Sequence, residues 1–480
     1  MKDSNSLSEE ERHRRRVFGS HMTSIDIFTD FIYPEIKEKL NKYIWVDLYA
    51  GEGNLILPIL NYINRENREV FFRNNIYMFD IQKKMVQNCI RNAQSYGISE
   101  SIAKANIQLR NNLENFPKFL KTLNKPIYHI TNPPYLYLGY ISKHESTKTF
   151  LRYFKGENSG YQDLYQIAMI NDLRNNIKDL IYIIPTNFLY GASVSNKFRI
   201  DFLKYYNIGK MIIFETKKFR FTGTNICIGY FKRKVKPNHS MCRFIGMKIY
   251  SNNQISKKKY NLNPNFKYRA GSDFDIFLKK FSTEDKLKVK YYLLAEEINS
   301  NLGNRIVTLL DANQYNNCEY EKVTFSVNLD LYNKLISNIL YVRTVDTGST
   351  EGRVGLSYIK EDFNVDGIFV SGNTYRTHPI HVFLHPELSI NKQQLLRKYF
   401  NFILEFFRDK LESEFLTTYK YSNASYTRKY LGLSQVRKII ETFPISMSES
   451  EEKDLNKIID NKKFAELMHF LEKLRMKFKD

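Results

Sequence analysis

The sequence predicts an α/β protein in which a doubly wound, mostly parallel sheet is followed by a mixed α+β domain. Three observations support this prediction. Short apolar strands alternate with helical stretches as far as residue 231. A glycine turn, Gly51-Glu52-Gly53, separates the first of these strands from an apolar run. Beyond residue 240 the alternation ends, and basic loops, short strands and helical patterns at 390–416 and 449–478 follow.

The length, charge and cysteine content limit the classes of protein to which the chain can belong. The 480 residues suffice for two or three domains, and 73 Lys and Arg against 51 Asp and Glu give a net charge of +22. Such a charge favours a polyanionic partner, most commonly nucleic acid, with a basic solvated surface as the alternative. Four distant cysteines without a C-x-x-C pair argue against a zinc ribbon or a disulfide scaffold. No apolar run approaches the ~20 residues of a membrane span, so we expect a cytosolic protein with no membrane partner.

The N-terminal region contains an arm, a helix and a strand. Residues 1–17 are charged and predict a mobile basic arm, and apolar residues at helical spacing behind Thr23 and Ser24 predict a helix. The strand from Tyr43 to Asp47 then leads into the glycine turn. A dinucleotide fingerprint would have a third glycine where Ile56 stands, so an uncharged or zwitterionic nucleoside ligand fits better than a pyrophosphate.

Acids stand at the ends of the first two strands. The second strand, 75–79, ends in Asp80 and precedes a helix from Ile81 to Tyr96. An acid at this place in a βαβ unit bonds ribose hydroxyls, and capping the following helix is its alternative role. Asp47 is a second candidate, whose alternative role is to fix the glycine turn. A third strand is predicted at 107–109.

The turn Asn132-Pro133-Pro134-Tyr135 follows the apolar strand 126–130, and its two prolines make it stiff. The amide oxygen of Asn132 and the carbonyl of Pro133 are two acceptors at the rim of the sheet. Together they suit an exocyclic amine, because both of its hydrogens can be held while its lone pair turns toward an electrophile. Tyr135 is placed to stack on the flat ring that carries this amine. An incidental Pro-Pro turn is the alternative.

After this turn the alternation of strands and helices resumes. Residues 139–160 are polar with three glycines, which predicts a mobile loop near the substrate. Asp163 opens a helix. Further strands are predicted at 180–184, 210–214 and 224–231. The charged, Pro-containing segment 232–240 is the expected domain boundary.

The order of these motifs resembles one known family. Residues 18–24, the segment Asp47 to Gly53, the Asn132 turn and a C-terminal domain are arranged as in the gamma class of DNA adenine-N6 methyltransferases, and the match covers about residues 15–231. The resemblance implies a class I methyltransferase sheet, S-adenosylmethionine as cofactor, S-adenosylhomocysteine as product, no metal, and an adenine flipped into the turn. Two departures stand out: Ser24 replaces the usual proline, and amides at 111 and 112 replace a common acid.

The resemblance assigns roles residue by residue. It implies cofactor contacts from Thr23, Asp47, Ala50, Gly51, Gly53, Asp80, Ile81, Asn111 and Asn132. It implies catalytic roles for Asn132, Pro133, Pro134, Tyr135 and Phe219, with Phe221 as the second choice for the aromatic opposite Tyr135. The implied domains are an arm at 1–17, a catalytic domain at 18–231, a linker at 232–240 and a target-recognition domain with C-terminal helices at 241–480. In that last domain the expected DNA contacts are Arg343, Arg353, Tyr426, Arg428 and Lys429.

The expected partner is double-stranded DNA, with a separately encoded restriction endonuclease for the same site, in a cytoplasmic protein of a prokaryotic nucleoid. Methylation of an RNA adenine or a protein glutamine, and a non-catalytic DNA-binding module, stay open as alternatives. A fused nuclease is disfavoured, since we find no convincing acidic cluster with a following Glu-x-Lys and the chain has little spare length for one. His378, His381 and His385 indicate a structural loop more than a zinc site, because Pro379 and Pro386 interrupt helical geometry and no cysteine is near.

Overall fold

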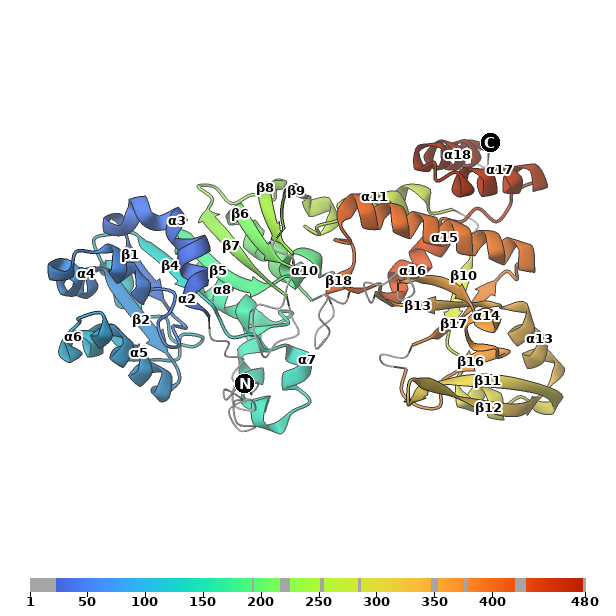
Figure 1. The fold of residues 1–480 in the computed structure, drawn as a ribbon, viewed down its shortest axis with the longest axis horizontal. Coiled ribbons are helices and arrows are strands. Elements are labelled where there is room, and N and C mark those ends of the chain that lie inside the picture. The colour runs from blue at the N-terminus through green and yellow to red at the C-terminus, as the bar shows by residue number, and fades with distance from the viewer. Residues whose placement is uncertain are drawn as a thin grey trace, which may run out of the picture. The chain divides into compact units, whose positions relative to one another are not determined.

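The computed structural model describes residues 23–191, 194–215, 225–250, 254–283, 286–346, 353–374, 378–418 and 429–477. These residues form two compact units, drawn in Figure 1. Unit 1 runs to Ala270, and unit 2 begins at Gly271.

Unit 1 is built on a nine-stranded sheet in the order β3-β2-β1-β4-β5-β7-β6-β8-β9. The strands are β1 (Ile44–Asp47), β2 (Ile76–Asp80), β3 (Ile107–Leu109), β4 (Ile127–Thr131), β5 (Asp179–Pro185), β6 (Tyr206–Phe214), β7 (Ile226–Arg233), β8 (Cys242–Ile249) and β9 (Ile255–Leu262). The first five strands in the order run parallel, whereas β7 is antiparallel to both of its neighbours and β9 to β8. The predicted mostly parallel sheet is confirmed, and the ends of β1 to β4 meet at one edge.

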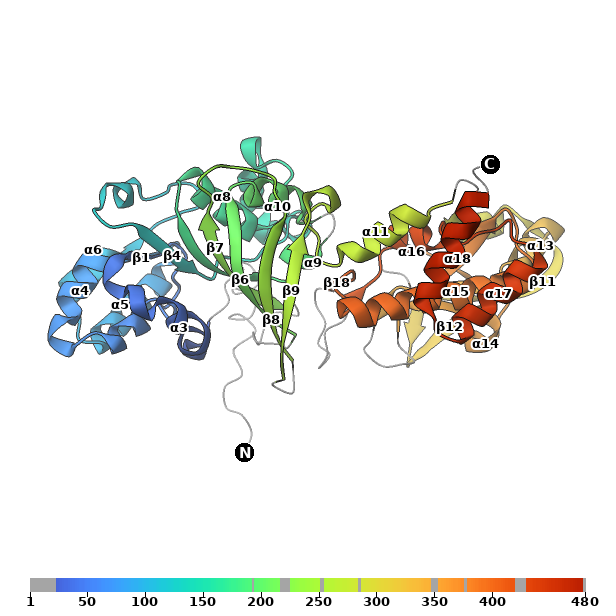
Figure 2. The same ribbon diagram turned by 90° about the horizontal axis from the view of Figure 1, so that it is seen from above.

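The predicted linker at 232–240 instead contains the last two residues of β7 and most of its connection to β8 within this one sheet (Figure 2). Its charges and its proline resemble a linker, which is why the sequence placed the boundary there. Strand β8 was missed because its residues alternate between buried and exposed from Cys242 onward, so that it offers only one apolar face. The compact units divide some thirty residues later, after Ala270.

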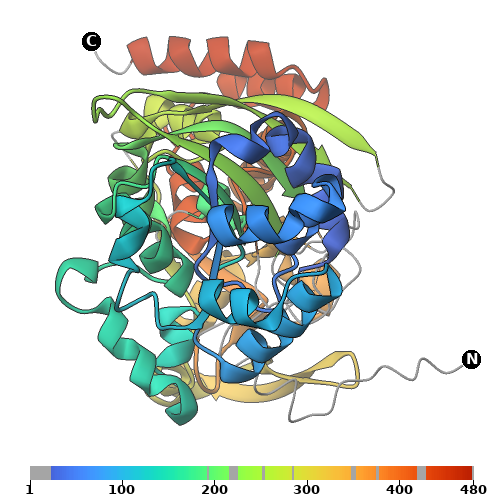
Figure 3. The same cartoon turned by 90° about the vertical axis from the view of Figure 1, so that its left-hand side faces the viewer.

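Helices cover both faces of the sheet. One face packs on α2 (Ile25–Ile27), η1 (Phe28–Ile32), α3 (Tyr33–Ile36), η2 (Lys37–Lys42), η3 (Leu57–Tyr62), η4 (Arg65–Asn67), α4 (Arg68–Asn75), α5 (Lys83–Ser95) and α6 (Glu100–Asn106). Figure 3 looks toward α4, α5 and α6, drawn in blue. The helix predicted from Ser24 is present, and the Ser24 hydroxyl accepts from the Asp26 N–H at its start. Its π-helical middle precedes Pro34, which has no N–H to continue regular α-helical bonding.

The opposite face carries η5 (Lys118–Thr122), α7 (Leu138–Ile141), η6 (Glu145–Phe154), η7 (Gly156–Asn158), α8 (Leu164–Arg174), α9 (Asn187–Tyr190) and α10 (Asn196–Leu203). The stretch 139–160, predicted to be a mobile loop, is therefore mostly helical. The reason is that Tyr153 and Phe154 are buried in the core, with 6% and 8% of their surface exposed, although their neighbours are polar.

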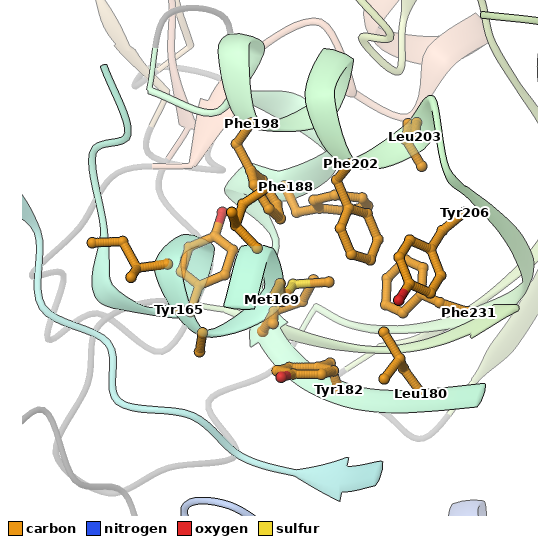
Figure 4. Packing of buried hydrophobic residues seen from close by; sticks show 14 of the residues in the cluster. Tyr165, Met169, Leu180, Tyr182, Phe188, Phe198, Phe202, Leu203, Tyr206 and Phe231 are labelled. Atoms are coloured by element: carbon orange, nitrogen blue, oxygen red, sulfur yellow. The ribbon is translucent and has the colours of Figure 1, made fainter. Parts of the chain in front are cut away.

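The core on this face is rich in aromatic residues. Figure 4 shows Tyr165 and Met169 of α8 packed near Tyr182 of β5 and the phenylalanines of α10. The rings of Phe202 and Tyr206 stack with centroids 4.5 Å apart. Burying each such side chain contributes roughly 1.5–3 kcal/mol, so α8 is held firmly against the sheet.

Unit 2 combines three small sheets with helices, as the mixed α+β prediction expects. The sheets are β10 (Lys288–Tyr291), β17 (Ile380–His385), β13 (Leu340–Arg343) and β15 (Gly355–Tyr358); β12 (Glu319–Val327), β11 (Leu302–Asn316) and β16 (Gly367–Phe369); and β14 (Val345–Asp346), β19 (Lys429–Tyr430) and β18 (Thr417–Thr418). A short helix, η8 (Pro264–Phe266), lies at the end of unit 1. The helices of unit 2 are α11 (Ser272–Phe281), α12 (Ala295–Asn299), α13 (Leu329–Ser337), α14 (Ile359–Phe363), α15 (Ile390–Leu411), α16 (Leu433–Ile440), α17 (Glu449–Asp460) and α18 (Phe464–Lys477).

Helix α15 forms the centre of the main core of unit 2, with buried residues along its whole length. The helical pattern predicted at 449–478 is two helices, α17 and α18, separated near Lys462 at a positive φ of 54°. Of the helices that the structure describes, none has the length and apolar character to cross a bilayer.

Candidate active site

A pocket lies at the sheet edge where the parallel strands β1 to β4 end, which is where open α/β sheets bind ligands. About 930 Å³ of space, including open solvent at its mouth, lies between the lining residues. The pocket is lined by Pro134 and by eight of the nine predicted cofactor residues: Thr23, Asp47, Ala50, Gly51, Asp80, Ile81, Asn111 and Asn132. The structure thus brings Thr23 and Asn132, which are 109 residues apart in the chain, into one pocket.

The two positions of the glycine turn require glycine for different reasons. Gly51 lines the pocket with φ of +56°, a conformation that side chains disfavour, and its N–H donates to Asp80 Oδ2 at 2.9 Å. Gly53, at φ of +86°, does not line the pocket. A Cβ there would stand 2.7 Å from Leu57 Cδ1 and 2.8 Å from Cys89 Sγ, so this glycine lets the turn pack closely against α5.

The two acids have different partners. Asp47 is 1% exposed, and its Oδ1 accepts from the Tyr49 N–H at 2.9 Å and from the Thr131 hydroxyl at 2.5 Å, which joins the ends of β1 and β4. Burial raises the pKa of its carboxyl to about 6. Asp80 accepts from the N–H groups of Gly51 and Gln82, and burial raises its pKa as well. Both acids therefore fix the glycine turn, Asp47 through the Tyr49 N–H and Asp80 through the Gly51 N–H, which is the alternative role considered for Asp47.

The side chain of Asn132 is held from both ends. Its Nδ2 donates to Thr23 Oγ1 at 3.0 Å, and its Oδ1 accepts from the Tyr135 hydroxyl. The same hydroxyl lies 2.6 Å from the Ile183 carbonyl, so its single proton has two acceptors within reach. Tyr135 is half-buried, edge-on to Tyr165, and like Pro133 it does not line the pocket. The structure therefore gives Tyr135 a positioning contact with Asn132 that the sequence did not predict.

A buried network behind the glycine turn was also missed. The Leu48 N–H donates to His129 Nε2 at 3.1 Å, so the proton of this neutral imidazole is on Nδ1, which donates to Asp172 Oδ2 at 2.6 Å. The Tyr182 hydroxyl donates to the same carboxylate oxygen at 2.6 Å. These groups tie the end of β1 to α8. Only one signal was available in the sequence, a lone histidine in an apolar strand.

The two asparagines after β3 both line the pocket. Asn111 donates to the Tyr153 hydroxyl at 2.8 Å, and Asn112 donates to the Leu48 carbonyl at 2.6 Å. The Oδ1 atom of Asn112 is buried and has no hydrogen-bond partner among the described groups. A buried acceptor of this kind is costly unless a ligand satisfies it, so Asn112 is the stronger candidate of the pair.

The remaining predicted residues lie elsewhere. Phe219, Phe221, Tyr426 and Arg428 are outside the described residues. In unit 2, Arg353 forms an ion pair with Glu405, Arg343 donates to the Tyr341 hydroxyl at 3.4 Å, and Lys429 donates to the Glu412 carbonyl at 3.1 Å. Strand β19, which contains Lys429, pairs with β14, two residues after Arg343.

The three histidines do not form a metal site, and within the described ranges no three His, Cys, Asp or Glu side chains are grouped to hold a metal ion. His381 is buried, donates to the Asn338 carbonyl at 2.8 Å and accepts from the Ile368 N–H at 3.3 Å. Burial lowers its pKa to about 4, as expected for a neutral structural histidine.

No family model and no curated protein matches the chain. Among solved structures, it is similar to the type IIL restriction-modification enzyme MmeI in complex with DNA, at 13% identity and a TM-score of 0.51, over 93% of this chain and 71% of that one. It also matches the EcoKI M protein of a type I restriction enzyme (12%, TM-score 0.34, half of each chain) and the type ISP enzyme LlaGI (12%, TM-score 0.39, 61% of this chain and 34% of that one). The chain thus spans half or less of the last two structures, and the likeness to MmeI shows a shared fold.

Proposed function

We propose that the chain is a DNA methyltransferase that transfers a methyl group from S-adenosylmethionine to the N6 amine of an adenine extruded from duplex DNA. One observation carries the proposal: Asn132 and Pro134 of the catalytic turn line the same pocket as Gly51 and Asp80. The proposed amine acceptor and the proposed nucleoside-binding turn would therefore serve one cavity.

The pocket residues fit S-adenosylmethionine. The Asp80 carboxylate can accept from ribose hydroxyls while it holds Gly51, since each carboxylate oxygen has two lone pairs. The unpartnered Asn112 oxygen can accept from an adenine amine, and Ile81, 49% exposed at the pocket, offers an apolar face to a ring. When bound, this cofactor supplies an electrophilic methyl group on a positively charged sulfur.

The chain's own part in the reaction is to position the amine and stabilise its charge. On this proposal the Asn132 Oδ1 and the Pro133 carbonyl accept both N–H groups, which favours a pyramidal nitrogen and stabilises the positive charge that develops on it. The Tyr135 hydroxyl can keep donating to Asn132 Oδ1 while this oxygen accepts from the amine, since an amide oxygen has two lone pairs. We further propose that the Tyr135 ring and Phe219 stack on the flipped base.

We propose duplex DNA as the partner, and unit 2 as the part that selects the sequence. The enzyme MmeI, whose structure was solved in complex with DNA, has the same fold, which supports this assignment. Strand β14, which follows Arg343, pairs with β19, which contains Lys429, so that Val345 lies opposite Tyr430 and Asp346 opposite Lys429. Arg343, Arg353, Tyr426, Arg428 and Lys429 stay the proposed DNA contacts, and a separately encoded nuclease for the same site is the proposed functional companion.

The test is methyl transfer in vitro. The purified chain is incubated with labelled S-adenosylmethionine and genomic DNA, and the nucleosides are identified by mass spectrometry. N6-methyladenine is expected from the wild type, and Asn132→Ala should lower the rate about 10²–10³-fold, as loss of one transition-state contact does. The matched control, Asn124→Ala, changes an exposed asparagine and should keep the wild-type rate. Product on RNA or protein alone, on cytosine, or an active Asn132→Ala would refute the assignment.

A further inference from the structure

The positive charge of the chain belongs to unit 1. Residues 1–270 contain 43 Lys and Arg against 22 Asp and Glu, a net charge of +21, whereas residues 271–480 contain 30 against 29, a net charge of +1. The excess is densest at the end of unit 1. Residues 232–270, which include the β8–β9 hairpin, contain eleven Lys and Arg and no acid.

The hairpin presents part of this charge on one exposed face. In the antiparallel register Ile245 lies opposite Lys259, Met247 opposite Lys257 and Ile249 opposite Ile255, so these side chains and that of Arg243 point to the same side of the sheet. Arg243, Lys257 and Lys259 are exposed, as are Ile245 and Ile255 at 58% and 59%. We call these five residues the basic hairpin face.

The opposite side of the hairpin explains why this face points outward. Phe244 and Tyr260 are buried there, stacked with ring centroids 5.1 Å apart, and Leu262 is fully buried in the same core. On the outer side, the N-terminal helices cover the neighbouring strands, where Phe31 packs edge-on against Phe214 at 5.3 Å. Among the described residues this cover does not reach the basic hairpin face.

The hairpin also ends at the catalytic edge of the sheet. Strand β8 is parallel to β6, and two successive antiparallel pairings, β6 with β7 and β7 with β5, leave β6 parallel to β5 and hence to β4. The end of β8 and the start of β9 therefore lie at the same edge as Asn132, with β9 outermost (Figure 2). A long anionic ligand bound at this face can extend along the edge that contains the pocket.

We propose that the basic hairpin face binds the phosphate backbone of duplex DNA, so that unit 1 supplies sequence-independent affinity as well as chemistry. The proposal rests on the proposed function for the identity of the nucleic acid. Charge complementarity carries it: three exposed cations share one face, in a segment without acids, and Lys and Arg are the residues that contact phosphates. The exposed isoleucines can pack against the sugars between the phosphates. Lysines on an edge strand can also serve only to prevent strand association, which the test separates.

The experiment compares two triple variants of the full chain. Arg243→Gln/Lys257→Gln/Lys259→Gln neutralises the basic hairpin face, and Lys453→Gln/Lys457→Gln/Lys473→Gln removes equal charge from exposed lysines on α17 and α18. Affinity for a duplex of about 30 base pairs, without S-adenosylmethionine, is measured by fluorescence anisotropy between about 50 and 300 mM salt. Three lost phosphate contacts should lower the slope of log affinity against log salt by about 3, and weaken binding at least about tenfold at the lowest salt.

The expected result is a lower slope for the hairpin variant and a wild-type slope for the control variant. S-adenosylmethionine binding should stay unchanged in both variants, which shows that unit 1 is folded. Four results would each overturn the proposal. The slope could stay unchanged in the hairpin variant, or it could drop equally in both variants. The hairpin variant could aggregate but keep wild-type DNA affinity, or it could lose affinity for single-stranded RNA but not for duplex DNA. Failure of the proposed function is recognised separately, because it would appear as no methylated adenine from the wild type.

Discussion

Units 1 and 2 differ in charge and in how their cores are built. Residues 1–270 have a net charge of +21 and residues 271–480 a net charge of +1, and in the described parts of the chain unit 1 has one large sheet and unit 2 three small ones. On the proposed function, general attraction to DNA and the chemistry reside together in unit 1. An almost neutral unit 2 would then gain little from phosphate attraction alone, and its contribution would depend on specific contacts. The overall charge therefore does not locate the sequence-reading part of such a chain.

The largest expected effect tests whether the units are independent. In unit 2, Arg408 Nε lies 3.2 Å from Asp346 Oδ2, with 9% and 10% of the two side chains exposed, and Arg408 also pairs with Glu405. Asp346→Ala leaves a buried guanidinium with less compensation, which should cost about 3–5 kcal/mol of unfolding free energy. Urea unfolding measures this, with exposed Asp409→Ala as the control. S-adenosylmethionine affinity should not change, and a parallel loss of that affinity would contradict the independence of unit 1.

The second prediction concerns pH and unit 1. Folding raises the pKa of Asp47 to about 6 from 3.8, so the folded chain binds this proton more tightly than the unfolded chain, and stability falls as pH rises from about 4 to about 6. Asp47→Asn keeps an acceptor for Tyr49 and Thr131 but does not titrate. As the pH rises from about 4 to about 6, the unfolding free energy of the wild type should therefore fall by about 3 kcal/mol relative to that of Asp47→Asn. Thermal unfolding at a series of pH values measures the shift, and a difference that does not depend on pH would count against it.

In unit 2, protonation of His381 gives the opposite dependence of stability on pH. Its pKa is lowered to about 4 from 6.5, so the unfolded chain binds the proton more tightly and stability rises as pH increases through that range. The imidazole resonances of His381 in an NMR titration should accordingly stay in the neutral form down to about pH 4. Titration near the ordinary histidine pKa would show that this side chain is not buried as the structure has it.

The fourth prediction concerns the cofactor. Asp80→Ala should weaken S-adenosylmethionine binding by about 1–3 kcal/mol, because a charged acceptor and the anchor of Gly51 are lost together. Asp80→Asn keeps one acceptor oxygen and should lose less. Isothermal titration calorimetry gives both values. Unchanged affinity in Asp80→Ala would remove this residue from the site.

The smallest expected effect separates two roles of Tyr135. Tyr135→Phe keeps the ring for stacking but removes the hydroxyl that contacts Asn132 Oδ1 and the Ile183 carbonyl. A lost hydrogen bond of about 0.5–1.5 kcal/mol predicts a few-fold to tenfold lower kcat, with an unchanged KM for S-adenosylmethionine. Exposed Tyr62→Phe is the control. If Tyr135→Phe kept the wild-type kcat, the hydroxyl would have no part in positioning Asn132.

The sequence predicted unit 1 better than unit 2, for physical reasons. Strands such as β1 and β5 are buried on both faces and leave continuous apolar runs. Strand β8 shows only an alternating apolar pattern beside a run of charges. The fifteen-residue β11 is mostly exposed at both ends and shows an even weaker apolar pattern. Side-chain pairs such as His129 with Asp172, 43 residues apart, depend on how α8 packs, which no local pattern encodes.

Those pocket residues that stand at the ends of strands could be predicted from the sequence. Asp47, Asp80 and Asn132 each stand directly at or after a strand, so the sheet edge brings them together. The preference for Asn112 over Asn111 was not predictable, because only the structure shows which oxygen is left without a partner. The placement of the domain boundary depended on β8, which the pattern of charges concealed.

The central claim is that unit 1 methylates adenine while unit 2 selects the site. Methylation-sensitive long-read sequencing of DNA from cells that express the chain tests it most directly. We expect modified adenine within a single short motif, and the same motif at lower occupancy when the basic hairpin face is neutralised. Substitution of Arg428 and Lys429 should instead change or abolish motif choice while S-adenosylmethionine binding stays intact. Modification scattered over all adenines, or no modified adenine in DNA, would contradict the claim.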